Sequence, residues 1–247
     1  MQAFGKLAWV QTKLYLREPM AVFFTLLFGP LLLLLFGIIF GNQPQDVLGG
    51  LGHLDVSVPS YTAAIIGIAA LTIVPITAVT RREKGVLRRF AATPLKPLVY
   101  FLTDILVPFL LTLSGVLLLF LLGILIYGVN FTGSWLDMLG ALCLSTLAFF
   151  SLGYALSTLL PSVQVATVAG NVLIIPMNIL SGALVPLEVM PDGIRDIARF
   201  LPLTYVVDLL RGMWIGAGWG AHRTEILVLA GLMLLGVTAV AFTFKWE

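Results

Sequence analysis

Long apolar stretches without Asp, Glu, Lys or Arg divide the chain. Five of them occur, and they cover Pro19–Gln45, Val56–Thr80, Ile105–Leu136, Met138–Leu187 and Ile226–Phe244. A bilayer core about 30 Å thick is crossed by about 20 apolar helical residues, so each stretch is long enough to span it. The fourth is long enough for two helices, and Pro161-Ser162 in its middle supplies a turn. The pattern therefore predicts an all-α polytopic membrane protein with six transmembrane helices, over residues 22–41, 60–80, 101–127, 138–160, 164–186 and 225–244.

The Lys and Arg residues gather in the connections on one side of these six helices. That side contains Lys6, Lys13, Arg17, Arg81, Arg82, Lys84, Arg88, Arg89, Lys96 and Lys245. The other side contains only Arg195, Arg199, Arg211 and Arg223. Because basic residues near helix ends tend to remain cytoplasmic, we expect a multi-pass protein of the cell inner (plasma) membrane with both termini in the cytoplasm. The first apolar run has no small-residue cleavage site after it, so it is interpreted as a retained span.

Composition supports a membrane protein and excludes several other classes. Hydrophobic residues make up 60% of the 247 residues and charged residues 11%, whereas roughly a quarter of a soluble domain is charged. The single cysteine, Cys143, excludes a disulfide framework within one chain. A net charge of +2 does not favour a nucleic-acid partner. We expect one transmembrane domain over residues 1–247, with non-spanning parts at 1–19, 81–100 and 187–223.

The first of these parts has the pattern of an amphipathic interfacial helix. At 100° per residue, one face carries Phe4, Leu7, Ala8, Gln11, Leu14 and Tyr15, and the opposite face carries Lys6, Lys13 and Arg17. Pro19 then ends the helix before the first span. Two interpretations stay open: an anchor on membrane lipids, or a docking surface for another protein.

The second part, residues 81–100, is short and strongly basic. It also carries Val86, Leu87 and Phe90, an apolar cluster that faces the cytosol unless something covers it. Taken alone, the arginines favour the positive-inside rule and binding of anionic lipid headgroups. The apolar cluster is what favours a protein partner.

The third part, residues 187–223, predicts two short amphipathic helices, one from Pro191 and one from Leu203 onward. Both are too short and too charged to span a bilayer, so they either lie at the outer interface or dip into the membrane with their polar faces against protein or water. Trp214 and Trp219 suit an interfacial aromatic belt.

No residue pattern supports catalysis, metal binding or nucleotide binding in this chain. No G-x-x-x-x-G-K-[ST] motif occurs, so energy must come from another subunit or from an ion gradient. A gradient-driven carrier usually has ionisable groups in the middle of its spans, and here Asp104 and Asp137 lie only near span ends. The two histidines, His53 and His222, are too few for a metal cluster, and we expect neither a catalytic residue nor a metal site.

A possible substrate path is less defined by the sequence. Asn171, Pro176 and Asn178 lie in the fifth span, and small residues and prolines recur in spans one, two and five. Ordinary close packing of helices explains most of these residues, and the rest are candidates for lining a cavity. Because the spans are almost uncharged, we expect an amphipathic or lipid-like substrate.

These segments in this order resemble the membrane subunit of a type-2 ATP-binding-cassette exporter, in particular the small drug-resistance permeases of the daunorubicin type. The motifs that carry the resemblance are Arg82-Glu83-Lys84-Gly85-Val86-Leu87-Arg88-Arg89, Ala92-Thr93-Pro94-Leu95, and Leu180-Ser181-Gly182 through Pro186, Met190-Pro191, Pro202 and Tyr205. Phe90 stands where many relatives carry Leu. The resemblance covers the whole chain.

The resemblance implies roles for all three non-spanning parts. Residues 1–19 would be a connecting helix, and the basic loop would be the coupling helix that docks into a groove on a nucleotide-binding ATPase subunit. Its contact residues would be Arg82, Glu83, Gly85, Val86, Leu87, Arg88, Phe90 and Pro94. Residues 187–223 would form re-entrant helices, with an outer gate at Pro186, Pro191, Pro202 and Tyr205. The resemblance also implies two permease copies, expected as a homodimer, and two ATPase subunits that bind the ATP and Mg; no cofactor is expected in this chain.

The expected function is therefore that of a permease subunit that exports a hydrophobic or amphipathic substrate (drug-like, lipid or lipid-linked), powered by ATP hydrolysis in a separate subunit. Two alternatives stay open: a non-transporting membrane scaffold or assembly subunit, and a gradient-driven carrier.

Overall fold

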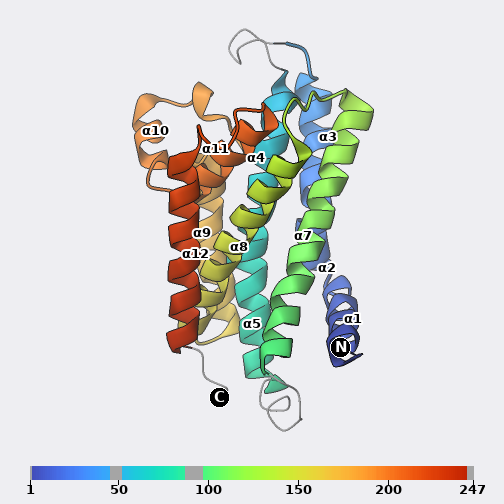
Figure 1. Ribbon diagram of the computed structural model, residues 1–247, viewed down its shortest axis with the longest axis vertical. Coiled ribbons are helices and arrows are strands. Elements are labelled where there is room, and N and C mark those ends of the chain that lie inside the picture. The colour runs from blue at the N-terminus through green and yellow to red at the C-terminus, as the bar shows by residue number, and fades with distance from the viewer. Residues whose placement is uncertain (1, 45–51, 87–96, 244–247) are drawn as a thin grey trace.

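The computed structural model describes residues 2–44, 52–86 and 97–243, which form an elongated bundle of helices (Figure 1). Apart from an isolated bridge between Pro44 and Gly52, the regular structure in these ranges is helical. The α-helices are α1 (Gln2–Leu16), α2 (Pro19–Val22), α3 (Phe28–Phe40), α4 (His53–Ile68), α5 (Val74–Glu83), α7 (Pro97–Tyr127), α8 (Trp135–Leu159), α9 (Val163–Leu180), α10 (Asp192–Ala198), α11 (Pro202–Trp214) and α12 (Arg223–Thr243). Two π-helical turns, η1 (Phe23–Leu27) and η3 (Ala69–Ile73), and one 3-10 turn, η4 (Leu187–Val189), complete the order.

Six helical segments of the described chain are long and apolar enough to cross a membrane, which confirms the predicted fold class. They are Pro19–Phe40, His53–Glu83, Leu102–Tyr127, Trp135–Leu159, Val163–Leu180 and Arg223–Phe242. The first joins α2, η1 and α3 into one span, and the second joins α4, η3 and α5.

Two predicted span ends are wrong. The second span begins at His53 rather than at residue 60, because Asp55 sits inside the first turn and its carboxylate accepts the Gly52 N–H at 3.0 Å. The fifth span ends at Leu180 rather than at residue 186. Gly182, with φ +86°, adopts the left-handed conformation that terminates many helices.

The second span is the centre of the bundle, and most of its residues are buried. Its α4 half packs against α3, α7 and α11, whereas η3 and α5 pack against α8 and α9. α1 and the carboxyl end of α12 lie at one end of the bundle, which we call the basic end (bottom of Figure 1), and α10 and α11 lie at the opposite end. Because the number of spans is even, the two ends of the described chain lie at the same end of the bundle.

A proline follows each π-helical turn in the first two spans. Pro30 lies four residues after Leu26 in η1, and Pro75 lies four residues after Leu71 in η3. A proline ring in a helix cannot donate a hydrogen bond and clashes with the carbonyl four residues earlier. The wider π-helical turn is the local consequence.

Glycines of neighbouring helices pack directly on these widened turns. A Cβ atom at Gly115 of α7 would overlap the carbonyl oxygen of Thr25 in η1, and one at Gly153 of α8 would overlap the carbonyl oxygen of Ala70 in η3. Backbones approach this closely only where no side chain intervenes. These two glycines, which the sequence reading did not single out, therefore set the spacing between α7, α8 and the first two spans.

Gly153→Ala is therefore expected to destabilise the protein by about 1–3 kcal/mol, because the new methyl group meets backbone atoms that cannot rotate away. Gly231→Ala in α12 is the matched control, since a Cβ there has no neighbouring atom within 4 Å. The control is expected to be neutral or to stabilise by less than about 1 kcal/mol. Thermal unfolding in detergent measures both, and equal melting temperatures for the two variants would contradict the packing described here.

Candidate functional site

The N-terminal helix α1 packs along α7 at the basic end. Of its predicted apolar face, Gln11 and Tyr15 are buried, but Leu14 remains exposed. The Tyr15 hydroxyl lies 2.7 Å from the Thr25 hydroxyl, so α1 is tied to the first span as well as to α7. Burial raises the pKa of Tyr15 to about 12.

The exposed side of α1 combines basic and apolar residues. Lys6, Lys13 and Arg17 are exposed, as predicted. Trp9 and Leu16, which the helical projection places away from the apolar face, are also exposed. α1 thus buries one face in the bundle and exposes Trp9 and the neighbouring basic residues on the surface of the basic end.

The basic loop, residues 81–100, has two stems: the end of α5, which leads into it, and the start of α7, which leads out of it. The first stem forms hydrogen bonds with the turn between α8 and α9. Arg82, at the end of α5, donates to the carbonyl oxygen of Ser157 at 3.3 Å and also to that of Leu160. The Glu83 carboxylate accepts the Val163 N–H at 3.0 Å, at the start of α9. Both contacts are favourable, because a cation suits the carboxyl end of a helix and an anion suits the amino end.

The remaining predicted coupling residues divide between described and undescribed segments. Gly85 has φ +63°, a conformation that disfavours any other residue, and Val86 is half-buried. Leu87, Arg88, Phe90 and Pro94 lie outside the described residues.

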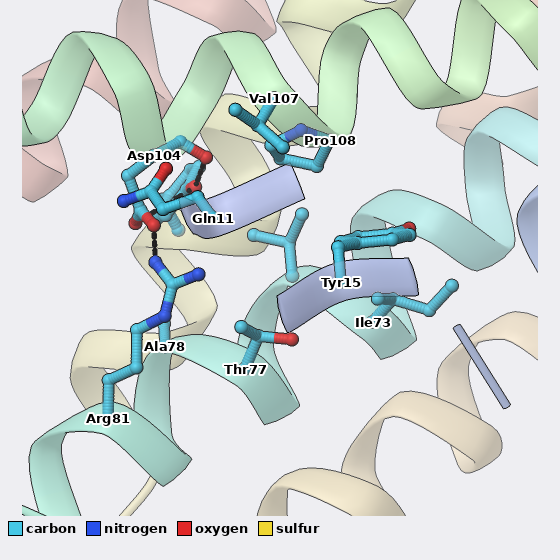
Figure 2. Close-up of a pocket in the computed structure, with 11 residues that line it drawn as sticks. Gln11, Tyr15, Ile73, Thr77, Ala78, Arg81, Asp104, Val107 and Pro108 are labelled. Carbon is cyan, nitrogen blue, oxygen red and sulfur yellow. Dashed lines mark hydrogen bonds and ion pairs between the residues drawn. The ribbon is translucent and has the colours of Figure 1, made fainter. Parts of the chain in front are cut away.

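The second stem is joined to the first by an ion pair (Figure 2). Arg81 of α5 pairs with Asp104 of α7, whose side chain is largely buried. The Tyr154 hydroxyl, from α8, lies 2.8 Å from the Asp104 carbonyl oxygen and 3.2 Å from its carboxylate. Gln11 of α1 lies over the same group. The sequence placed Asp104 near a span end but gave no sign of its partner.

A small cavity lies among these side chains. It is lined by residues of α1, η3, α5, α7 and α8, including Gln11, Tyr15, Arg81, Asp104 and Tyr154. Its volume of about 20 Å³ is far below the roughly 300–1,000 Å³ of organic ligand pockets. The cavity therefore belongs to the packing of the basic end and is not a substrate site of this chain.

At the opposite end, α11 is embedded in the bundle. Its predicted apolar face is fully buried against α4, α8 and α12, as are Leu203 and Val207. Trp214 is only 1% exposed, and its indole N–H donates to the carbonyl oxygen of Asn130 at 3.0 Å. The expectation that Trp214 belongs to an interfacial belt is therefore wrong, because its ring fills the core beside Phe120 and Phe131.

The prolines of this region begin its helices. Pro202 is the first residue of α11, Pro191 immediately precedes α10, and Pro186 immediately precedes η4. The Tyr205 hydroxyl donates to the Arg199 carbonyl oxygen at 2.8 Å, which fixes the turn between α10 and α11.

The polar side of α11 meets protein groups. Arg211 forms an ion pair with Glu188 at 2.9 Å and donates to the Ser60 hydroxyl of α4 at 2.8 Å. Asp208 lies one turn earlier, near His222 and Glu225. Burial raises the pKa of Asp208 to about 6, with Glu225 and Glu188 adding to the shift and Arg211 and His222 opposing it.

The raised pKa of Asp208 predicts a pH dependence of stability. A carboxyl with a higher pKa in the folded than in the unfolded state favours folding below its unfolded pKa of about 3.9, and this contribution is lost as the pH rises through about 6. The melting temperature of Asp208→Asn minus that of the wild type is therefore expected to increase as the pH rises from 4.5 to 7.5. Asp196→Asn, at an exposed position, should instead follow the wild type; a pH-independent difference for Asp208→Asn would contradict the assignment.

Asp55 connects three segments at the same end. It is 6% exposed, and besides Gly52 it accepts the Asn130 N–H at 2.9 Å and the Asn42 side-chain amide at 3.2 Å. It thereby joins the segment after α3, the start of α4 and the segment after α7. The sequence reading treated Asp55 only as the boundary of an apolar run.

The residues predicted for the substrate path differ in their exposure. Asn171, at the middle of α9, and Pro176 are exposed, whereas Asn178 is buried with its side-chain oxygen unpaired among the described residues. Gly67 of the central span packs against Ile174 and Leu203, so the small residue there serves helix packing.

Comparison with known proteins decides the family. A sequence model described as ABC-2 type transporter matches residues 2–215. The chain belongs to the ABC-2 type transporter family. As a member, it is the membrane subunit of an ABC transporter.

The ABC-2 chain is similar to two kinds of curated protein. It is 36% identical over 98 residues to nodulation protein J of Rhizobium leguminosarum bv. trifolii, which covers 38% of this chain and 37% of the relative. It is 23% identical over 186 residues to the probable multidrug ABC transporter permease YbhS of Escherichia coli (strain K12), which covers 75% of this chain and 48% of the relative. The chain thus spans less than half the length of these relatives.

Proposed function

We propose that this protein is the permease subunit of an ATP-driven exporter that moves a hydrophobic or amphipathic substrate out of the cell. Two copies would combine with two ATPase subunits, which bind the ATP and Mg. The family assignment and the attachment of the basic loop to the bundle carry this proposal. In this proposal, the six spans lie in the inner membrane of the cell, and both termini and the basic end lie in the cytoplasm.

The basic loop is the proposed coupling element. Its apolar residues Val86, Leu87 and Phe90 would dock into the ATPase, and its basic residues, with Pro94, would orient it. Movement of a docked loop reaches the bundle directly, because Arg82 and Glu83 connect its first stem to α8 and α9. A loop attached only through flexible chain would transmit little force.

The embedded position of α11 supports a re-entrant role between spans five and six. Its length of 13 residues is too short to span a bilayer. Its polar residues bond to protein, as lipid surroundings require. Pro186, Pro191, Pro202 and Tyr205 would shape this outer gate by fixing the turns around α10 and α11.

The exposed middle of α9 supports a second copy of the chain. An Asn side chain facing hydrocarbon at the centre of a span would lose its hydrogen bonds to water, which costs several kcal/mol by transfer scales, about 2–7. Asn171 occupies that position. A homodimer in which this face meets the partner or a water-filled path removes the cost, and Asn171, Pro176 and Asn178 would then line or adjoin the path.

The charge distribution supports the proposed substrate class. Several charged residues near the spans are held in contacts within the chain, such as the Arg81–Asp104 ion pair and the Asp55 hydrogen bonds. A path built from such spans offers apolar and amide surfaces, which suit a drug-like, lipid or lipid-linked molecule better than a highly charged one.

Inside-out vesicles containing the native complex test the energy source and the direction together. Uptake of an NBD-labelled phospholipid and of a lipophilic cationic dye should require hydrolysable ATP and should persist after a protonophore collapses the proton gradient. Uptake that needs the gradient and ignores ATP would identify a gradient-driven carrier instead. The absence of uptake and of any associated ATPase would favour a scaffold.

A further inference from the structure

The two stems of the basic loop are joined where they enter the bundle. Arg81 belongs to α5, which leads into the loop, and Asp104 belongs to α7, which leads out of it. Their side chains form an ion pair, and the pair lies inside the basic end, where the Asp104 side chain is 9% exposed and the Arg81 side chain 21% (Figure 2). Partly buried ion pairs are screened by salt much less than surface pairs.

Other contacts extend this pair into a network across the basic end. Tyr154 binds both the carbonyl oxygen and the carboxylate of Asp104, which adds α8. Gln11 of α1 lies over the pair, whereas Tyr15 of the same helix lines the other end of the cavity, and its hydroxyl contacts Thr25 of the first span (Figure 2). A force on either stem is thus shared by α1, α5, α7, α8 and the first span.

We infer that Arg81 and Asp104 are positioning residues that hold the two stems at one fixed separation throughout the transport cycle. This inference rests on the proposed function, in which the loop is moved by an ATPase. The ion pair would keep α5 and α7 together, so that movement of the loop displaces both helices as one rigid body. Without the ion pair, movement of the loop would separate the stems from each other and would not be transmitted to the other helices of the bundle.

The sequence could not reveal this role. The two residues are separated by the whole basic loop, and each lies at the edge of an apolar run where a charge is ordinary. Removing one partner alone would leave a buried charge uncompensated, which is costly and would confuse folding with coupling. The informative change therefore removes both charges at once.

The test measures the separation of the stems by pulsed electron paramagnetic resonance. Spin labels are placed at Lys84 and Leu102, both exposed, in a chain whose single Cys143 is replaced by Ala. The labelled chain is mixed with an excess of unlabelled chain before the complex is assembled, so that only one permease copy carries labels. The wild-type complex should then give one narrow distance with and without ATP. Arg81→Gln/Asp104→Asn should broaden it, and Arg81→Lys/Asp104→Glu, which keeps the charges, should restore the narrow distance.

Labels at Ile38 and Leu125, exposed on α3 and α7 towards the opposite end, provide the control pair. Their separation should be the same in the wild type and in Arg81→Gln/Asp104→Asn, which shows that the variant is folded. A second distance between Lys84 and Leu102 on adding ATP to the wild type would overturn the inference, because the pair would then open. An unchanged narrow distance in the doubly neutral variant would also overturn it.

Failure of the proposed function would be recognised separately. If no ATPase accompanies the chain, the proposed function fails, while the comparison of the wild type and the doubly neutral variant without nucleotide still decides whether the ion pair holds the stems.

Discussion

Asp55→Ala is expected to lower the stability of the purified protein by about 3–5 kcal/mol, or roughly 10 °C in melting temperature. The carboxylate accepts hydrogen bonds from Gly52, Asn42 and Asn130, and all three donors lose their acceptor when the side chain is cut back. A buried donor without a partner costs about 1–3 kcal/mol. Thermal unfolding in detergent measures the change.

Two further aspartate variants make this prediction specific. Asp55→Asn keeps one acceptor oxygen but turns an amide NH2 towards a donor, so its loss should be intermediate. Asp192→Ala removes a side chain that is 97% exposed and forms only a long ion pair of 3.5 Å with Arg195, so it should melt with the wild type. Equal melting temperatures for Asp55→Ala and Asp192→Ala would contradict the role of Asp55 in joining the three segments.

Replacing Val86, Leu87 and Phe90 together by Ser is expected to weaken binding of the ATPase subunit about 100–1,000-fold. Burying an apolar side chain contributes about 1.5–3 kcal/mol when burial is complete, so partial burial of three accounts for a loss of this size. The variant should still insert and fold, because the three residues belong to the loop and its stem. Titration of the purified permease with its ATPase, followed by microscale thermophoresis, gives both dissociation constants.

The matched control separates apolar docking from charge. Arg88→Gln/Arg89→Gln keeps the apolar cluster and removes two charges of the loop, so it should weaken ATPase binding less than tenfold. It should also reduce binding to vesicles that contain anionic lipid, which the Ser variant should retain. The opposite pattern, with the charges decisive and the apolar residues dispensable, would assign the loop to lipid headgroups.

The sequence predicted the architecture well because a membrane imposes simple rules on composition. Runs without charged residues located all six spans, and amphipathic periodicity located α1, α10 and α11. The same rule caused the error at the second span. A carboxylate that caps a helix, as Asp55 does, looks like a boundary when charges are read only as interruptions.

The arrangement of the polar residues depends on tertiary contacts that periodicity does not encode. The pairing of Arg81 with Asp104 and the contact between Glu83 and the start of α9 join residues that are far apart in the chain. Gly115 and Gly153 matter only because π-helical turns meet them. One signal was readable: Ser181-Gly182 after a long apolar run marks a helix end, and it would have placed the end of α9 correctly.

Purification of the tagged chain from its native host in mild detergent tests the central claim most directly, with identification of the bound proteins and an assay of ATP hydrolysis. The account predicts one ATPase subunit with a phosphate-binding loop for each permease chain, in a complex that hydrolyses ATP and that dissociates when Val86, Leu87 and Phe90 are replaced. Recovery of the self-associated chain without an ATPase, under conditions that preserve other membrane complexes, would contradict it.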